Sequence, residues 1–349
     1  MNSFGRFFRV HIFGESHGES VGITIDNCPA GLPLKADDFL NDIERRKGGT
    51  QKGTTPRQES DLPIFKSGIF NDTTTGAPVT ILFENNNTRS GDYQKQRAVP
   101  RPGHADFVAH QKYGGFEDYR GGGHFSGRLT VALVAAGVIA KKLLQLATPT
   151  SNNEALTEVK SAGISVIASI LEIGGEKDLE KGLQKAIDAK DSIGGIVECR
   201  VNGLPAGLGE PFFDSAESLL SHAVFAIPAI RGIEFGTGFA AASMFGSDHN
   251  DAIADTSGTT ITNHAGGIAG GITNGNELVF RIAVKPTSST PKPQQTLNWE
   301  TGAVEAFSVK GRHDLCIALR VPVVLEAITA IVLADLMLIE QKIPRIIHT

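Results

Sequence analysis

The apolar positions of this chain follow two periods, which predict strands and helices. Residues 21–25, 79–83 and 278–284 are short, mostly β-branched or aromatic apolar runs that are typical of strands. Residues 130–146 and 322–341 are long apolar segments, which favour buried helices. Further strands are predicted at residues 7–13, 164–170 and 195–201, and further helices at residues 34–46, 178–190 and 215–225. Strands and helices both abound, without the regular alternation of a doubly wound sheet.

Polar segments separate some of these elements. Residues 48–61 and 84–102 lack an apolar period, and loops of this length inside a compact domain tend to be functional. No linker or low-complexity tract divides the chain, so we expect one domain over residues 1–349. Pro-Ala-Gly-Leu occurs at residues 29–32 and again at 205–208, each time after a predicted strand. This indicates either two halves with a common strand–turn–helix plan or a chance recurrence of common turn residues.

Composition narrows the class of protein. A chain of 349 residues with 40% apolar and 20% charged residues can bury a large core, which favours a soluble globular protein without a secretory signal. Polar residues interrupt the most apolar segment, residues 321–339, so we expect a buried helix there and no membrane span. The net charge of −5 offers no general attraction to nucleic acid or membranes. Three cysteines without metal-ligand spacing indicate a reducing cytoplasm and no disulfide framework.

The basic residues are unevenly spread. Arginines and lysines lie beside Gly, Pro, Ser or Thr at residues 45–47, 52–57 and 101–103, and at both ends of the segment 120–128. In an acidic protein such concentrations favour a site for a small polyanion, because loop N–H groups can face the same anion. The alternative for each arginine taken singly is an ordinary solvated side chain.

Four clusters carry chemistry. Residues 14–18 (GESHG) follow a predicted strand and place an acid, a hydroxyl and an imidazole in one glycine-flanked turn. Residues 101–106 (RPGHAD) deliver a second histidine on a Pro-Gly turn. Residues 118–128 (DYRGGGHFSGR) run into the helix predicted from residue 130, where glycines and the helix dipole favour an anion. Residues 310–314 (KGRHD) combine cations, an imidazole and a carboxylate before the final helix.

The ordered set of these motifs resembles the chorismate synthase family. GESHG, RPGHAD, RGGG followed by SGR, and GRHD occur in that family's order, together with TTPR at 54–57, NHAGG at 263–267 and KPTSS at 285–289. The resemblance covers nearly the whole chain and is weakest over residues 147–191. The chain departs from the family pattern at five positions: Gly48 and Leu315 replace prolines, Lys52 replaces a frequent arginine, and His124-Phe125 replace Arg-Ser.

The resemblance implies both fold and activity. The fold implied is an α+β sandwich in which helices pack between antiparallel sheets, with two similar halves in one domain, assembled as a homotetramer. The activity implied is an anti-1,4-elimination in which 5-enolpyruvylshikimate 3-phosphate loses phosphate and a ring C6 hydrogen to give chorismate. The cofactor implied is reduced FMN, although the reaction involves no net redox change. NADPH would serve only indirectly, and a separate flavin reductase would supply the reduced flavin.

Residue roles follow from the same motif matches. His17 is expected to protonate the departing phosphate, His104 to protonate or stabilise the reduced flavin, and Asp314 to lie near the flavin N5 and assist removal of the C6 hydrogen. Ser16 and Ser126 would support this proton network. The positions expected to bind substrate anions are Arg46, Arg57, Arg128 and Arg312, and Arg46 and Lys52 also match positions linked to NADP. The positions that match flavin contacts are His124, Phe125, Ser126, Pro228, Ala229, Gly270, Lys285, Pro286, Thr287, Ser288, Ser289 and Arg312.

Alternatives stay open at this point. His17 could be an ordinary turn residue, and Asp314 could form a structural ion pair with His313 that caps the last helix. We interpret Glu326 and Asp335 as charges on a helix face or at an interface, and not as acids of the reaction. Two other functions use the same residue types, a non-catalytic flavin-binding protein and a metal-dependent phosphohydrolase. The latter lacks HExxH, paired-Asp or Cys/His ligand spacing, and we expect no metal.

Overall fold

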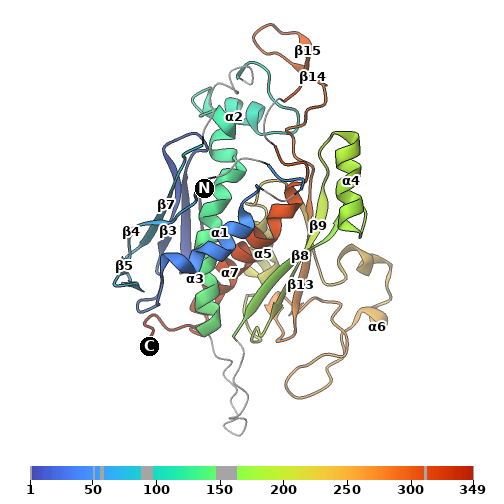
Figure 1. Ribbon diagram of the computed structural model, residues 1–349. Coiled ribbons are helices and arrows are strands. Elements are labelled where there is room, and N and C mark those ends of the chain that lie inside the picture. The colour runs from blue at the N-terminus through green and yellow to red at the C-terminus, as the bar shows by residue number, and fades with distance from the viewer. Residues whose placement is uncertain are drawn as a thin grey trace.

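A computed structural model describes residues 2–49, 52–55, 59–87, 97–146, 163–309 and 313–348. A layer of helices lies between two antiparallel sheets (Figure 1). The first sheet has the strand order β1-β2-β3-β7-β4 and the second has the order β10-β13-β9-β8. The α+β sandwich predicted for the chain is therefore confirmed.

The strands are short and all named pairs of strands run antiparallel. In the first sheet they are β1 (Ser3–Phe4), β2 (Arg9–Gly14), β3 (Ser20–Asp26), β4 (Ile64–Ser67) and β7 (Val79–Glu84). In the second they are β8 (Ser165–Ile173), β9 (Gly195–Asn202), β10 (Ile230–Phe235) and β13 (Leu278–Val284). Three hairpins add β5 (Ile69–Phe70) with β6 (Thr73–Thr74), β11 (Ile268–Ala269) with β12 (Ile272–Thr273), and β14 (Gln294–Leu297) with β15 (Val304–Phe307).

The helices between the sheets contribute a large part of the core. They are α1 (Leu40–Arg46), α3 (Thr130–Leu146), α5 (Ala216–Val224) and α7 (Val321–Ile339). Three more lie toward the periphery in Figure 1: α2 (Asp106–Tyr113), α4 (Leu179–Ala189) and α6 (Gly246–His249). The closest helix pairing joins α3 to α7, where a Cβ on Gly137 would lie 2.2 Å from the Cβ of Ala327. Glycine at 137 thus permits this close approach.

Both central helices owe their apolar composition to burial. The helical stretches Gly127–Leu146 and Ile317–Ile339 are long and apolar enough to cross a membrane. Within the described structure, however, 78% and 89% of their most apolar windows are buried between the sheets. They therefore behave as core helices, as the interrupted apolar run predicts.

The two halves of the chain share one plan. Strands β2, β3, β7 and β4 of the first sheet have the same order of neighbours as β8, β9, β13 and β10 of the second. The two Pro-Ala-Gly-Leu turns are also built alike. Thr74 donates its hydroxyl to the carbonyl of Pro29 and accepts from the amide of Leu32, and Thr273 does the same with Pro205 and Leu208. The repeated tetrapeptide therefore marks equivalent turns and is not a chance recurrence.

Several predicted elements differ in detail from the structure. The helix expected at 34–46 begins as a 3-10 helix, Ala36–Phe39, in which Asp38 folds back to accept from the amide of Lys35. Helix α2 was not predicted, since its sequence has no regular apolar period. The strand expected at 7–13 begins at Arg9.

The two acids of the last helix are buried, which corrects their interpretation as helix-face or interface charges. Glu326 accepts from Arg45 at 2.7 Å, from Lys141 at 2.7 Å and from the amide of Ala168 at 3.1 Å. Burial opposes ionisation of Glu326, but Arg45 and Lys141 outweigh it and hold its pKa below the usual value. Asp335 accepts three backbone amides of the N-terminal segment, from Arg6, Phe7 and Phe8. Both acids therefore join separate elements of the fold.

Candidate active site

A cavity of about 690 Å³ lies where the two halves meet. Its walls include Thr130 at the start of α3 and Val321 at the start of α7, so the N-terminal ends of both central helices reach it. Helix N-termini carry partial positive charge and unpaired N–H groups, which favour anions. Leu133, Val324 and Ile328 give the cavity an apolar side as well. Its volume lies within the range of about 300–1,000 Å³ that ligand pockets occupy.

The GESHG turn places His17 on this cavity. It connects β2 to β3, and the side-chain amide of Asn85 holds it by donating to the carbonyls of Glu15 and Gly18 at 3.0 and 2.9 Å. His17 is buried, with 7% of its surface exposed, and lines the cavity wall. The turn therefore fixes an imidazole where strand β2 ends and strand β3 begins.

The triple glycine of residues 121–123 gives the two site histidines their space. A Cβ on Gly121 would lie 2.4 Å from Cδ2 of His17, and one on Gly122 would lie 3.1 Å from Cε1 of His104. Both glycines have positive φ angles, +60° and +83°, that side-chain-bearing residues rarely adopt. The RGGG motif thus packs its backbone against both imidazoles.

His104 is held from two sides. Its Nδ1 lies 2.6 Å from Asp106 Oδ1, and Asp106 in turn receives the guanidinium of Arg101. The preceding Gly103 carbonyl accepts from Lys285 at 3.0 Å and from Ser288 at 2.7 Å. The RPGHAD and KPTSS segments, far apart in sequence, therefore form one wall of the cavity.

Two buried arginines share one carboxylate. Asp61 accepts from Arg46 at 3.0 Å and from Arg128, and the side chain of Asp61 is fully buried. Burial alone would raise the pKa of Asp61, but the two guanidiniums outweigh it and lower that pKa. Burial and neighbouring Arg320 lower the pKa of Arg46 to about 10, so its guanidinium stays charged at neutral pH. The cluster of two arginines and Asp61 therefore keeps one net positive charge beside the cavity.

Asp314 lines the cavity, and hydrogen bonds hold its carboxylate in place. Its carboxylate accepts from the amide of Thr55 at 2.8 Å and from Arg320 at 3.0 Å, and Arg320 also donates to the carbonyl of Arg46. The ion pair that the alternative expected between Asp314 and His313 is therefore made with Arg320, which lies at the N-terminal end of α7. His313 lines the cavity too, and burial, with Arg101 nearby, lowers its pKa.

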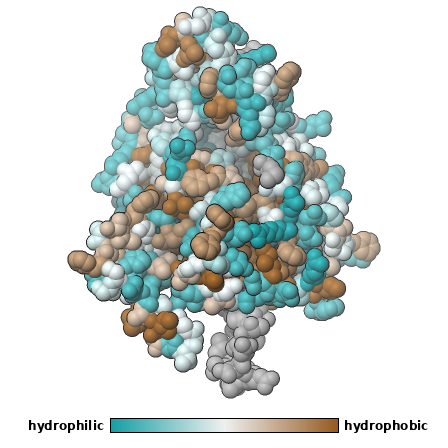
Figure 2. All heavy atoms as spheres, turned by 180° about the vertical axis from the view of Figure 1, so that it is seen from behind, coloured by the Kyte–Doolittle hydropathy of each residue, from teal (hydrophilic) through white to brown (hydrophobic). Residues whose placement is uncertain are grey.

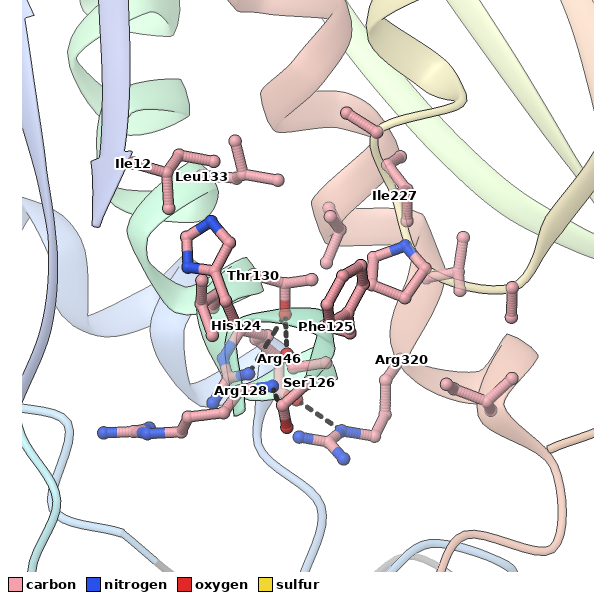
Figure 3. A pocket seen from close by; sticks show the side chains of 18 of the residues that line it. Ile12, Arg46, His124, Phe125, Ser126, Arg128, Thr130, Leu133, Ile227 and Arg320 are labelled. Atoms are coloured by element: carbon pink, nitrogen blue, oxygen red, sulfur yellow. Dashed lines mark hydrogen bonds between the residues drawn. The ribbon is translucent and has the colours of Figure 1, made fainter. Parts of the chain in front are cut away.

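The loop before α3 forms the centre of the view in Figure 3. His124 Nδ1 donates to the carbonyl of Gly14 at 2.8 Å, which joins this loop to β2. Phe125 and Ser126 lie between the side of the cavity that carries Ile12 and the side that carries Ile227 (Figure 3). Because Nδ1 is engaged, His124 has Nε2 left for a ligand.

Most of the residues predicted for the site lie together. Those that line the cavity are His17, Arg46, His104, His124, Phe125, Ser126, Arg128, Pro228, Ala229, Lys285, Thr287, Ser288, Ser289 and Asp314. Ser16, Lys52, Gly270 and Pro286 are not among the described lining residues. Lys52 donates to Gln184 of α4, and Gly270 lies in the β11–β12 turn. Arg57 and Arg312 fall outside the described residues.

Some residues of the site were not predicted from the sequence. Arg101 and His313 lie within recognised motifs, which was the available signal, although only their neighbours were assigned roles. Asp61, Asn85 and Arg320 lie outside all four clusters, and only their contacts with the arginines and Asp314 reveal them.

The chain was compared with known proteins. A sequence model described as chorismate synthase matches residues 8–338. A chorismate synthase of Chitinophaga pinensis is 70% identical over 346 residues, covering 99% of each chain. One from Dehalococcoides mccartyi is 44% identical over 375 aligned positions, again covering 99% of each. A solved structure titled "Crystal Structure of Chorismate Synthase" superposes with a TM-score of 0.68 at 25% identity, covering 96% of this chain and 93% of that one.

Proposed function

The chain belongs to the chorismate synthase family, and we propose that the cavity between its two halves carries out the elimination of that family. The enzyme is a lyase: 5-enolpyruvylshikimate 3-phosphate loses phosphate from one ring position and hydrogen from C6 to give chorismate. Such a reaction requires a proton for the departing phosphate, a group that assists loss of the C6 hydrogen, and cations that hold the anionic substrate.

One observation carries the proposal. Two imidazoles, His17 and His104, lie on the same cavity as the carboxylate Asp314 and the arginines Arg46 and Arg128. These residues come from segments between positions 17 and 314, so only the fold brings them together. The cavity therefore holds acid, base and anion-binding groups in one enclosure.

The cavity also fits a flavin mononucleotide. Its apolar wall can face a planar ring, while Lys285, Ser288 and the helix N-termini can face a phosphate. Arg46 Nε and His313 Nε2 are buried without a hydrogen-bond partner among the described residues. Buried polar atoms of this kind are satisfied when a ligand is present. When bound, reduced FMN would supply an electron transiently and recover it.

The protein's own side chains would supply the proton transfers and the anion binding. His17 delivers a proton to the departing phosphate, and Arg46 and Arg128 hold the substrate anions. His104 holds a proton at Nε2 on the flavin side, and Asp314 assists loss of the C6 hydrogen. Ser126 and the buried hydroxyl of Ser16, which has no partner among the described residues, support these transfers. Arg46 and Lys52 are the positions proposed for NADP, and a separate reductase is proposed to supply reduced flavin.

An anaerobic assay tests this function. We expect chemically reduced FMN and 5-enolpyruvylshikimate 3-phosphate to yield chorismate and phosphate in equal amounts, followed by absorbance and by phosphate release. Omission of flavin and addition of a chelator are the controls. Phosphate without chorismate, abolished by the chelator, would identify a metal-dependent phosphohydrolase. FMN binding without either product would leave a flavin-binding protein.

We further propose a homotetramer that works in the cytoplasm. Apolar side chains spread across the middle of the face seen in Figure 2. The five most exposed phenylalanines of the described residues are Phe116, Phe212, Phe213, Phe239 and Phe245. Exposed aromatic residues in such number favour contacts between proteins. Cys28, Cys199 and Cys316 are free and buried, which suits a reducing compartment. Sedimentation equilibrium should give the mass of four chains, and a monomer at micromolar concentration would contradict the tetramer.

A further inference from the structure

We propose that Asn85 is a positioning residue that holds the proton donor His17 and the anion-binding Arg128 in one fixed arrangement. The proposal rests on the roles given to these two residues above. Both of them line the cavity, whereas Asn85 is not among the described lining residues. It therefore acts through His17 and Arg128 and does not itself touch a ligand.

The first sheet fixes the backbone of Asn85. This residue directly follows β7, whose last residue Glu84 pairs with Ser20 of β3. The amide of Asn85 then donates to the carbonyl of Glu19 at 3.0 Å, which extends the pairing of the two strands by one residue. The side chain of Asn85 therefore starts from a rigid point beside the GESHG turn.

The side-chain amide of Asn85 uses both of its protons on the GESHG turn. Its Nδ2 donates to the carbonyl of Glu15 at 3.0 Å and to that of Gly18 at 2.9 Å. These two residues flank Ser16 and His17, and the amide of Gly18 also donates to the carbonyl of Glu15 at 3.1 Å. One amide group thus closes the turn that carries the imidazole of His17.

The oxygen of the same amide binds Arg128. Oδ1 of Asn85 accepts from Nε of Arg128 at 2.8 Å, and the neighbouring carbonyl of Glu84 accepts from Nη2 at 3.1 Å. Nη1 of Arg128 donates to Asp61. The opposite orientation of the asparagine amide would set its NH₂ group against a guanidinium N–H and its oxygen against two carbonyls. The partners therefore permit only the orientation that joins the turn to the guanidinium.

This link matters because His17 and Arg128 serve the same substrate. His17 has to reach the departing phosphate while Arg128 holds a substrate anion, and a displacement of about 1 Å costs about a hundredfold in rate. The loop before α3 holds the start of the turn, since the amide of Ser16 donates to the carbonyl of Gly123 at 3.1 Å. Asn85 holds the end of the turn and ties it to the cation.

A double-mutant cycle of Asn85→Ala with His17→Ala tests the inference, because residues that act as a unit have non-additive effects. In the parent background, Asn85→Ala should lower kcat about tenfold to a hundredfold, since the turn loses both hydrogen bonds from the amide. In the His17→Ala background it should lower kcat less than about twofold, whereas a general structural role would lower kcat equally in both.

The KM for the substrate tests the second half of the link. Arg128 loses one of its acceptors in Asn85→Ala, while Asp61 and the carbonyl of Glu84 still hold it. The KM should therefore rise by up to about tenfold, the effect of one hydrogen bond to a charged group. This rise should occur whether histidine or alanine stands at position 17.

Hydrogen exchange of the ligand-free protein, followed by mass spectrometry, gives a readout that does not depend on activity. The peptide that contains residues 14–18 should exchange faster in Asn85→Ala than in the parent. Asn276→Ala is the matched control, because Nδ2 of Asn276 donates to the carbonyl of Gly258 at 3.1 Å and its Oδ1 accepts from the amide of Thr260 at 3.0 Å. Asn276 is not among the described cavity residues, so this variant should change neither kcat nor the exchange of residues 14–18.

Asn85→Asp replaces the alanine variant if that variant fails to fold. A carboxylate keeps an acceptor for Arg128 but has no proton for the carbonyls of Glu15 and Gly18. The faster exchange of residues 14–18 and the lower kcat should therefore remain.

The outcomes separate this inference from the role of His17. Unchanged exchange of residues 14–18, or an equal fall in kcat in both backgrounds, would overturn the hold of Asn85 on His17, and an unchanged KM would overturn its hold on Arg128. Faster exchange, a fall in kcat that requires His17 and a raised KM support the inference. Faster exchange with full turnover in both Asn85→Ala and His17→Ala would support the hold of Asn85 on the turn but overturn the role of His17.

Discussion

Replacing His17 by alanine will lower the turnover of the elimination by about 10²- to 10⁴-fold, the usual effect of losing a general acid. The imidazole is buried at the cavity edge and packs against Gly121, so its removal leaves the departing phosphate without a positioned proton donor. Water that enters the space can still donate a proton, but it is not oriented toward the departing phosphate as the imidazole is. Turnover is measured anaerobically with reduced FMN, as release of chorismate and phosphate.

The control for His17→Ala is His348→Ala, because His348 is exposed near the C-terminus and is not among the described cavity residues. This control should keep parental turnover. Thermal unfolding of both variants shows whether the loss at His17 is chemical or structural. If folded His17→Ala turned over within threefold of the parent, another group would have to protonate the phosphate.

The predicted elements that proved accurate include the buried helices and strands and the amphipathic helix α4, which was predicted at 178–190 and is observed at Leu179–Ala189. Helix α3 and strand β13 have the bounds predicted for them, and α7 differs by two residues at most, because each is buried along most of its length. Helix α2 lies at the periphery and its apolar residues follow no period, so the sequence held no comparable signal. Hairpins with strands of two residues, such as β5 with β6, are too short to show an alternation of apolar and polar residues.

The candidate site was predictable in its motifs and not in its partners. GESHG, RPGHAD and SGR supplied His17, His104 and Arg128, since glycines and prolines mark the turns that carry them. The carboxylate of Asp61 was not predicted, because a single acid in a polar loop looks the same whether it faces water or two arginines. Such pairing depends on long-range packing that local patterns do not encode.

The repeated turn illustrates a second limit. Pro-Ala-Gly-Leu indicated two similar halves, and Thr74 and Thr273 show that the turns are equivalent. The halves nevertheless contribute different chemistry to the cavity: the first supplies His17 and His104, and the second supplies Asp314 and Lys285. Similar backbones therefore place unlike side chains on one enclosure, which fold similarity alone could not reveal.

Asp61→Asn is expected to lower the free energy of unfolding by about 3–5 kcal/mol at pH 7, the usual cost of breaking a buried ion pair. Arg46 and Arg128 expose only 4% of their side chains each, and both donate to Asp61. An asparagine keeps the shape and removes the charge, so two guanidiniums would stay buried without their counter-ion. Urea unfolding of parent and variant at pH 7 measures the difference.

The matched control is Asp214→Asn, which removes the carboxylate partner of Arg6 at the surface, where both side chains are about half exposed. Surface pairs contribute about 0–1 kcal/mol, so this variant should unfold nearly as the parent does. Equal losses in Asp61→Asn and Asp214→Asn would show that the two arginines find other compensation.

The pH dependence gives the same prediction an independent check. The folded-state pKa of Asp61 is lowered, so its stabilising contribution is fully present above the unfolded-state value of about 3.9 and is lost as the pH falls through the folded value. The difference between parent and Asp61→Asn should therefore stay constant from about pH 5 to 8 and shrink below about pH 4. A difference independent of pH down to pH 2 would mean that the carboxylate charge is not what holds the two arginines together.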